Sequence, residues 1–196
     1  LHQHAATFTP PPGFTRRRLD RILARGEQDV LFDASCMASL TAQAQTALIQ
    51  TRQRVERALA LLYADPSGQR VIHNDLWHGN IKVHHGRLHP LDFEDTVWGY
   101  PVQDIAPALQ DLMMDTQPEE YDRLQQALRS GYESRLPWPE SYEGQIDTLR
   151  AGRMLWVANY VARCEREHLA AFMARLAPRL QAFLDTGRIV HVKRAV

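Results

Sequence analysis

Hydrophobic residues between Cys36 and Tyr63 recur near the helical spacing of 3.6 residues. Leu48, Val55 and Leu59 belong to this stripe, and the turn-forming run Asp65-Pro66-Ser67-Gly68 stops it. The pattern predicts one long helix over Cys36–Tyr63 that packs into the core.

The second half of the chain carries further helical patterns. They predict one helix over about Val102–Met114, another over Pro118–Ser134, and two successive helices between Glu143 and about Leu184, ended by Asp185-Thr186-Gly187. Apolar residues at helical spacing in the last two helices are candidates for the core: Leu149, Leu155, Trp156, Tyr160, Phe172, Leu176 and Phe183.

The beginning of the chain is less regular. Leu1–Ala5 resembles the tail of a helix, and Thr9–Gly13 contains three prolines, which predicts an extended linker. Phe14–Asp33 mixes basic and short apolar groups and predicts a brief helix followed by a loop.

The stretch Val71–Asp92 departs from this helical background. Ile81–His84 and Arg87–Leu91 flank a His85-Gly86 turn, and Gly86 can adopt the positive φ that a tight turn requires. The expected fold class is therefore mainly α with a small β-hairpin.

Composition narrows the class of protein. The chain has 196 residues, 23 basic and 23 acidic, and 44% are hydrophobic, which suits one globular domain over residues 1–196. Balanced charge gives no reason to expect nucleic acid as a partner. No apolar run approaches the roughly 20 residues that span a bilayer. Two cysteines, Cys36 and Cys164, make no disulfide framework, so we expect a cytoplasmic protein. We expect both cysteines to be small apolar residues that fill space in the core.

The candidate chemistry lies in the same unusual stretch. His73, Asp75, Leu76 and Asn80 match the kinase catalytic-loop pattern H-x-D-L-x-x-x-N, and Asp92-Phe93 matches the metal-binding pair, although Glu94 stands where protein kinases have Gly. Phosphoryl transfer needs a carboxylate that accepts the hydroxyl proton and hard oxygen ligands for Mg²⁺. Taken alone, Asp75 would equally suit an ordinary loop or helix-capping carboxylate.

Three motifs in order carry a family resemblance. His73–Asn80 reads H-N-D-L-W-H-G-N, Leu91–Glu94 reads L-D-F-E, and Gly99–Ala106 reads G-Y-P-V-Q-D-I-A. They resemble the H-G-D-L-H-x-x-N, I-D-F/W and D-P-x-x-D-L-A motifs of the aminoglycoside phosphotransferase-like kinases, also called the phosphotransferase enzyme family. Asn74 replaces the usual Gly of the first motif.

The resemblance implies roles for five residues. Asp75 would be the catalytic base, and Asn80 and Asp92 would hold Mg²⁺ and with it ATP. Asp104 would brace the catalytic loop from the following helix, and His73 would pack beneath the loop and hydrogen-bond its backbone. The implied partners are a nucleotide and a hydroxyl-bearing substrate, either a small molecule or a protein Ser/Thr.

The implied fold is the C-terminal lobe of a kinase without its β-rich N-terminal lobe. No Gly-rich loop occurs, and the only lysines, Lys82 and Lys193, lack the context of the ATP-contacting lysine. Residues 1–13 would be the helix tail and linker that follow the missing lobe. A face left uncovered by that lobe would favour homo-oligomers.

Other readings stand beside that of an ATP-dependent kinase. A derived module could bind metal, nucleotide or a partner without turnover, and the donor could be GTP instead of ATP. The histidines His78, His84, His85 and His89 raise the idea of a zinc hydrolase. His84 and His85 are adjacent, however, so on a strand they would point to opposite faces, and no standard zinc spacing is met.

Overall fold

The computed structural model describes residues 1–191, which form two compact units. Among the described residues, unit 1 contains Leu1–Leu19 and Pro66–Ile146, and unit 2 contains Asp20–Asp65 and residues 147–191. The apolar-basic tail from residue 192 to 196, which includes Lys193, lies outside the described residues.

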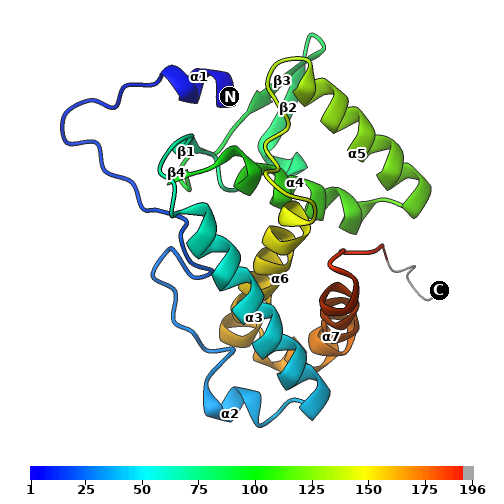
Figure 1. The fold of residues 1–196 in the computed structure, drawn as a ribbon. Helices are drawn as coiled ribbons and strands as arrows, with labels where there is room; N and C mark the ends of the chain where they lie inside the picture. The colour runs from blue at the N-terminus through cyan, green and yellow to red at the C-terminus, as the bar shows by residue number, and fades with distance from the viewer. Residues whose placement is uncertain (192–196) are drawn as a thin grey trace. The chain divides into compact units, whose positions relative to one another are not determined.

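Unit 1 holds the stretch that carries the three motifs. Its elements are α1 (His2–Thr7), β1 (Arg70–Ile72), the 3₁₀ turn η1 (His78–Asn80), β2 (Ile81–His84), β3 (Arg87–Pro90), β4 (Val97–Gly99), α4 (Pro101–Asp115) and α5 (Pro118–Glu133) (Figure 1).

Strand β1 precedes the first two motifs in the sequence and β4 follows them, and the two strands form an antiparallel pair. Val71 lies opposite Trp98 in this pair. Trp98 also bonds the N-terminal segment, because its N–H donates to Arg17 O at 2.7 Å and its carbonyl accepts from Leu19 N at 3.1 Å. The ends of the loop that carries Asp75 and Asp92 are thereby held together.

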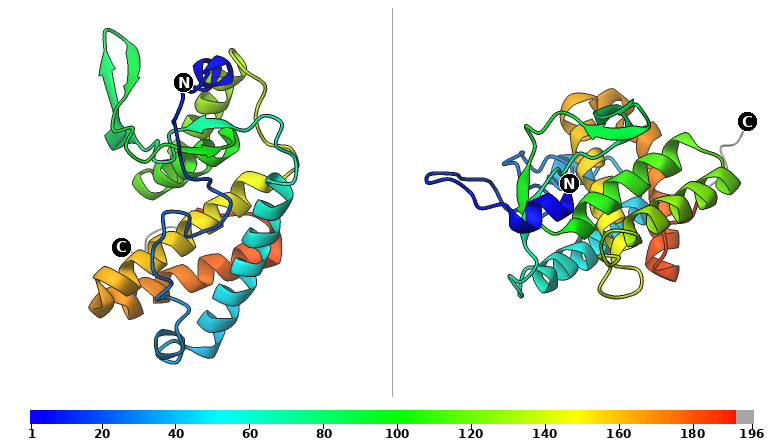
Figure 2. Two further views of the ribbon diagram at one scale, coloured as in Figure 1. Left: turned by 90° about the vertical axis from the view of Figure 1, so that its left-hand side faces the viewer. Right: turned by 90° about the horizontal axis from the view of Figure 1, so that it is seen from above.

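Strands β2 and β3 form the predicted hairpin. Lys82 lies opposite His89, and the turn residue His85 has φ 48° before Gly86 with φ 69°. The hairpin projects away from α4 and α5, and the side chains along its outer part are exposed (Figure 2).

Helix α4 follows β4 and is packed into the core of unit 1. Pro101 occupies its first turn, where a missing N–H costs nothing, and Gln103 Oε1 accepts from Tyr100 N at 3.0 Å. Val102, Ile105 and Leu109 are almost fully buried at helical spacing. Gln103 and Ala106 are buried too, so the first turns of α4 are enclosed on all sides, and Asp104 of the third motif lies in the interior of the unit.

Unit 2 is helical. Its elements are α2 (Ala34–Met37), α3 (Ala42–Leu62), α6 (Gln145–Cys164), whose first two residues belong to unit 1, the 3₁₀ turn η2 (Arg166–His168) and α7 (Leu169–Thr186). Helices α3 and α7 pack against each other. A Cβ at Gly152 of α6 would lie 2.9 Å from Val55 Cγ1 of α3, so the two helices approach closely because residue 152 has no side chain.

The core of unit 2 confirms most of the predicted apolar positions. The side chains of Leu48, Val55, Leu155 and Phe183 are at most 1% exposed. Tyr160 was a predicted core residue but is 44% exposed, so that prediction was wrong. Its ring stacks on Trp156 of the same helix, with centroids 6.4 Å apart, instead of packing inward.

Two other predictions need correction. The predicted helix over Cys36–Tyr63 is interrupted, because α2 ends at Met37 and α3 starts anew behind Thr41, whose hydroxyl accepts from Ala44 N at 3.2 Å. The brief helix expected within Phe14–Asp33 does not form, since that segment consists of turns, extended chain and the bridge to Trp98.

The cysteines differ from each other. Cys36 is fully buried, as expected of an apolar filler, whereas Cys164 is exposed and does not fill space. Among the described helices, none has the length and apolar character that crossing a membrane requires.

Candidate active site

The loop after β1 brings Asp75 and Asn80 into contact. Trp77 N donates to Asp75 O, and Asn80 N donates to Trp77 O, both at 3.0 Å, so the chain folds back within six residues. A Cβ at Gly79 would overlap the Trp77 ring, which only glycine avoids. As a result, Asn80 Nδ2 donates both to Asp75 O at 2.9 Å and to Asp75 Oδ2 at 3.0 Å.

The donor set of this loop fits a hard divalent cation. The Asn80 amide nitrogen is already engaged by Asp75, so its remaining polar atom is the oxygen Oδ1. Asp75 contributes a half-buried carboxylate beside it. Carboxylate and amide oxygens are the protein ligands that Mg²⁺ prefers.

Asp92 is held next to the loop through its neighbour Leu91. Leu91 N donates to Asn80 O at 2.8 Å, and Leu91 O accepts from His73 Nε2 at 2.7 Å. Asp92 itself is exposed and has φ 58°, in the left-handed region that residues with a side chain rarely adopt. Strained backbone of this kind is concentrated at functional sites, where the surrounding structure maintains it.

His73 lies beneath the loop. Its side chain is 1% exposed, and its ring packs against Phe93 with centroids 4.9 Å apart. The bond from Nε2 to Leu91 O links the first motif directly to the second. His73 thus has a packing position, and its imidazole is not presented to solvent.

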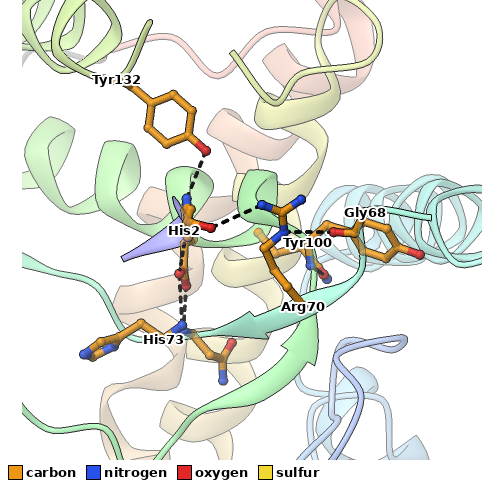
Figure 3. Close-up of polar contacts among 9 residues, drawn as sticks. His2, Gly68, Arg70, His73, Tyr100 and Tyr132 are labelled. Atoms are coloured by element: carbon orange, nitrogen blue, oxygen red, sulfur yellow. Dashed lines mark hydrogen bonds and ion pairs between the residues drawn. The ribbon is translucent and has the colours of Figure 1, made fainter. Parts of the chain in front are cut away.

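Asp104 of α4 is fully buried and accepts hydrogen bonds from the loop backbone. His73 N donates to Oδ2 at 2.9 Å, and Asn74 N donates to Oδ1 at 2.6 Å (Figure 3). Asp104 lies in the first turn of α4, where the helix dipole favours a negative charge. The third motif is thereby bonded to the backbone immediately before Asp75.

Sequence reasoning missed two residues that contact Asp104 directly or through one partner. His2 Nε2 bonds Asp104 Oδ2 at 2.9 Å, and His2 Nδ1 bonds the Tyr132 hydroxyl at 3.0 Å. The Leu1–Ala5 segment was recognised only as a helix tail. Nothing in its spacing indicates a contact with a carboxylate that is 102 residues away in sequence.

A cavity of about 240 Å³ opens beside His73 and Phe93. The rest of its lining is nearly all apolar and comes from Leu1, His4, Ala5, Phe8, Phe14, Val71, Ile72 and Thr96. Such a lining suits an apolar or aromatic group rather than a phosphate.

The hairpin histidines form no metal site within residues 1–191. His85 lies in the turn rather than on a strand, so its ring does not point away from that of His84 as expected. The centroids of the two imidazole rings are 4.0 Å apart. The metal-compatible group among the described residues is His78, Asp111 and Asp115. Asp111 Oδ2 already accepts hydrogen bonds from the ring and the backbone N–H of His78, and these bonds account for the cluster.

Comparison with known proteins identifies the family. The model of the phosphotransferase enzyme family matches residues 1–138. A comparison with curated protein sequences gives no significant match.

Three solved structures resemble the chain in fold. A microcompartment-associated aminopropanol kinase has a TM-score of 0.71 at 18% identity, over 97% of this chain and 61% of that one. The amicoumacin kinase hAmiN, solved in complex with AMP-PNP, Ca²⁺ and Ami, has a TM-score of 0.69 at 17% identity, over 98% of this chain and 57% of that one. The spectinomycin phosphotransferase APH(9)-Ia has a TM-score of 0.52 at 13% identity, over 96% and 60%.

The chain can be compared with these solved structures in length and in fold. The chain spans about three-fifths of the length of the solved structures it matches. Its kinase-like fold, with helices and small antiparallel pairs, agrees with theirs, and the family model covers all three motifs. The chain therefore belongs to the phosphotransferase enzyme family.

Proposed function

We propose that the chain carries the catalytic base and the Mg²⁺ ligands of a kinase that transfers the γ-phosphate of ATP to a hydroxyl group. The supporting observation is the bond of Asn80 to Asp75, which sets a carboxylate and an amide oxygen side by side in the loop. The family and the folds of the similar kinases agree with this reaction class.

Asp75 is proposed as the general base. Its carboxylate accepts the proton of the attacking hydroxyl while the new bond from oxygen to the γ-phosphorus forms. The bond between the γ-phosphorus and the bridging oxygen breaks, and ADP leaves. The bond from Asn80 Nδ2 to Asp75 Oδ2 orients this carboxylate for the transfer.

Asn80 Oδ1 and the Asp92 carboxylate are proposed as the Mg²⁺ ligands. When bound, Mg²⁺ would neutralise the charge of the phosphate groups. Asp92 is kept near Asn80 by the bonds of Leu91. His73 and Asp104 are proposed to support the loop through the hydrogen bonds described above.

The acceptor is proposed to be a small molecule with a hydroxyl group. The similar structures include kinases described as acting with aminopropanol, amicoumacin and spectinomycin, so the first panel of acceptors consists of amino alcohols and aminocyclitols. A Ser/Thr-containing protein serves as the second acceptor class.

Replacing the base tests this function. Asp75→Asn keeps the size and polarity of the side chain but cannot accept the proton, so the rate of phosphate transfer from ATP should fall by about 10²- to 10⁴-fold. Radiolabelled γ-phosphate measures the transfer to the acceptor panel. Asp122→Asn, which changes an exposed carboxylate on α5, is the matched control and should retain the wild-type rate.

Two outcomes would contradict the assignment. One is an Asp75→Asn variant that transfers phosphate as fast as the Asp122→Asn control. The other is a full-length wild-type protein that transfers phosphate to none of the acceptors. That result would favour a binding module without turnover.

A further inference from the structure

The buried imidazole of His2 connects two groups that the proposed reaction does not use directly. His2 is 6% exposed, its Nε2 bonds Asp104 Oδ2 at 2.9 Å, and its Nδ1 bonds the Tyr132 hydroxyl at 3.0 Å (Figure 3). The three residues come from α1, α4 and α5. Asp104 is therefore contacted from the loop on one side and from His2 on the other.

The direction of each hydrogen bond follows from the partners. Asp104 accepts the N–H groups of His73 and Asn74, so its carboxylate acts as an acceptor, and His2 Nε2 carries the proton that it donates to Oδ2. In a neutral imidazole, Nδ1 then accepts from the Tyr132 hydroxyl. Burial raises the pKa of the Tyr132 phenol, which keeps that hydroxyl protonated.

The backbone of His2 is held as well. Arg70 of β1 donates from Nη1 to His2 O at 3.2 Å and from Nε to Gly68 O at 3.1 Å. Tyr132 packs edge-on against the imidazole, with ring centroids 5.7 Å apart. The His2 side chain is thus restricted in position by neighbours on three elements, which favours a fixed hydrogen bond to Asp104 over an exchanging one.

Asp104 is connected to the proposed base, Asp75, through the backbone of Asn74. Asp104 receives the Asn74 N–H at 2.6 Å, Asn74 has φ 67°, and Asp75 is the next residue. A left-handed residue with a side chain persists only where its surroundings hold it there. The carboxylate that does so for Asn74 depends on His2 for its third hydrogen bond.

We propose that His2 is a positioning residue of the phosphotransfer site, which acts through the Asp104 carboxylate to fix the backbone of residues 73–75. The inference rests on the proposed function for its catalytic part, because His2 touches neither Asp75 nor a substrate. Its structural part, the rigidity of the loop, is measurable without turnover.

The test compares variants that differ in one hydrogen-bonding group. His2→Phe removes both ring nitrogens and keeps the ring shape. His2→Gln retains an N–H donor that reaches about as far as Nε2, and Tyr132→Phe removes only the outer hydroxyl. His89→Phe is the matched control, because His89 is an exposed histidine of the same unit.

Amide hydrogen exchange by NMR supplies the first readout. We expect exchange at His73 N and Asn74 N to be at least about tenfold faster in His2→Phe, in line with the loss of a hydrogen bond to a charged group. His2→Gln should restore most of the protection, Tyr132→Phe should have a smaller effect, and His89→Phe none. Amides in α3 and α7 of unit 2 report on global stability and should be unchanged.

The second readout is steady-state kinetics of phosphate transfer. Misplacement of Asp75 should lower kcat of His2→Phe about 10- to 100-fold and leave KM for ATP within about threefold, with recovery in His2→Gln. A merely structural role would instead lower the fraction of folded protein and leave kcat per folded molecule unchanged.

The outcomes separate the two proposals. Unchanged protection of the two amides in His2→Phe, or an equal loss of protection in unit 2, overturns the role of His2 whatever the activity. Faster exchange with unchanged kcat per folded molecule also overturns it. If the wild type itself transfers no phosphate, the proposed function fails, and the exchange data still decide whether His2 holds the loop.

Discussion

At the scale of single residues, the site depends on backbone that most amino acids avoid. Asn74 has φ 67° and directly precedes Asp75, and Asp92 has φ 58° and lies just beyond the β2–β3 hairpin that follows Asn80. Asparagine tolerates the left-handed region better than most residues. Asn74 also donates from Nδ2 to Asp95 O, although that contact is long at 3.4 Å.

The left-handed conformation of Asn74 predicts a reversal of the usual order of glycine and alanine. At an ordinary φ, glycine is less stable than alanine by about 0.5–1 kcal/mol. At residue 74, Asn74→Ala should be less stable than Asn74→Gly by about 1–2 kcal/mol, because only alanine has a Cβ that resists positive φ. Urea denaturation of both variants measures the difference. A variant pair in which alanine is the more stable would contradict the conformation.

Residue identities at the site were predictable only where they belong to a local motif. Asp75, Asn80 and Asp92 lie within 18 residues, and one loop and one hairpin bring them together, so spacing alone indicated their neighbourhood. His2 and Tyr132 reach Asp104 through contacts that span the unit. Their chemistry could not be read from the sequence because no periodic pattern connects them.

At the scale of elements, η1 is bonded to α4 by a charged pair. His78 Nδ1 and His78 N both contact Asp111 Oδ2, at 2.7 and 3.1 Å, and Asp115 Oδ2 lies 3.5 Å from Nδ1. The hydrogen bond to Asp111 and the charges of Asp111 and Asp115 raise the pKa of His78 above its ordinary 6.5. The protonated imidazole is therefore favoured in the folded state.

This raised pKa predicts how stability changes with pH. Since the folded state holds the His78 proton more tightly than the unfolded state, the contribution is fully present below pH 6.5 and is lost as pH rises through the folded-state pKa. The difference in unfolding free energy between wild type and His78→Gln should thus be largest in acid and shrink in alkali. Urea denaturation across this pH range measures it.

The partner variant controls this prediction. Asp111→Asn removes the larger of the two charges that raise the His78 pKa, so the stability of this variant should lose most of the same dependence on pH. The assignment is wrong if the stability difference of His78→Gln stays constant with pH, or if NMR titration shows the same His78 pKa in wild type and Asp111→Asn.

Elements were predicted well where periodicity is strong. The helices α4, α5, α6 and α7 and the hairpin of β2 and β3 agree with their patterns to within a few residues. The interruption before α3 was missed because Cys36 and Met37 continue the apolar pattern, whereas Thr41 caps a new helix. Strand β4 was missed since three residues paired with β1 carry no periodic signal of their own.

At the scale of the whole molecule, the three motifs predicted the family and the kinase-like fold, and both are confirmed. All three motifs lie in unit 1. The acceptor could not be predicted, because residues that select a substrate have no portable motif and fold alone does not determine function.

Binding of Mg²⁺ and ATP measured by calorimetry tests the central claim, that Asn80 and Asp92 hold Mg²⁺ and with it ATP beside the proposed base Asp75. The account predicts that the wild type and Asp122→Asn bind ATP saturably in the presence of Mg²⁺. The affinity for ATP should be at least about tenfold lower in Asp92→Asn, because that variant loses a charged ligand of Mg²⁺. Equal affinity of Asp92→Asn and Asp122→Asn, or no binding by the wild type, would contradict it.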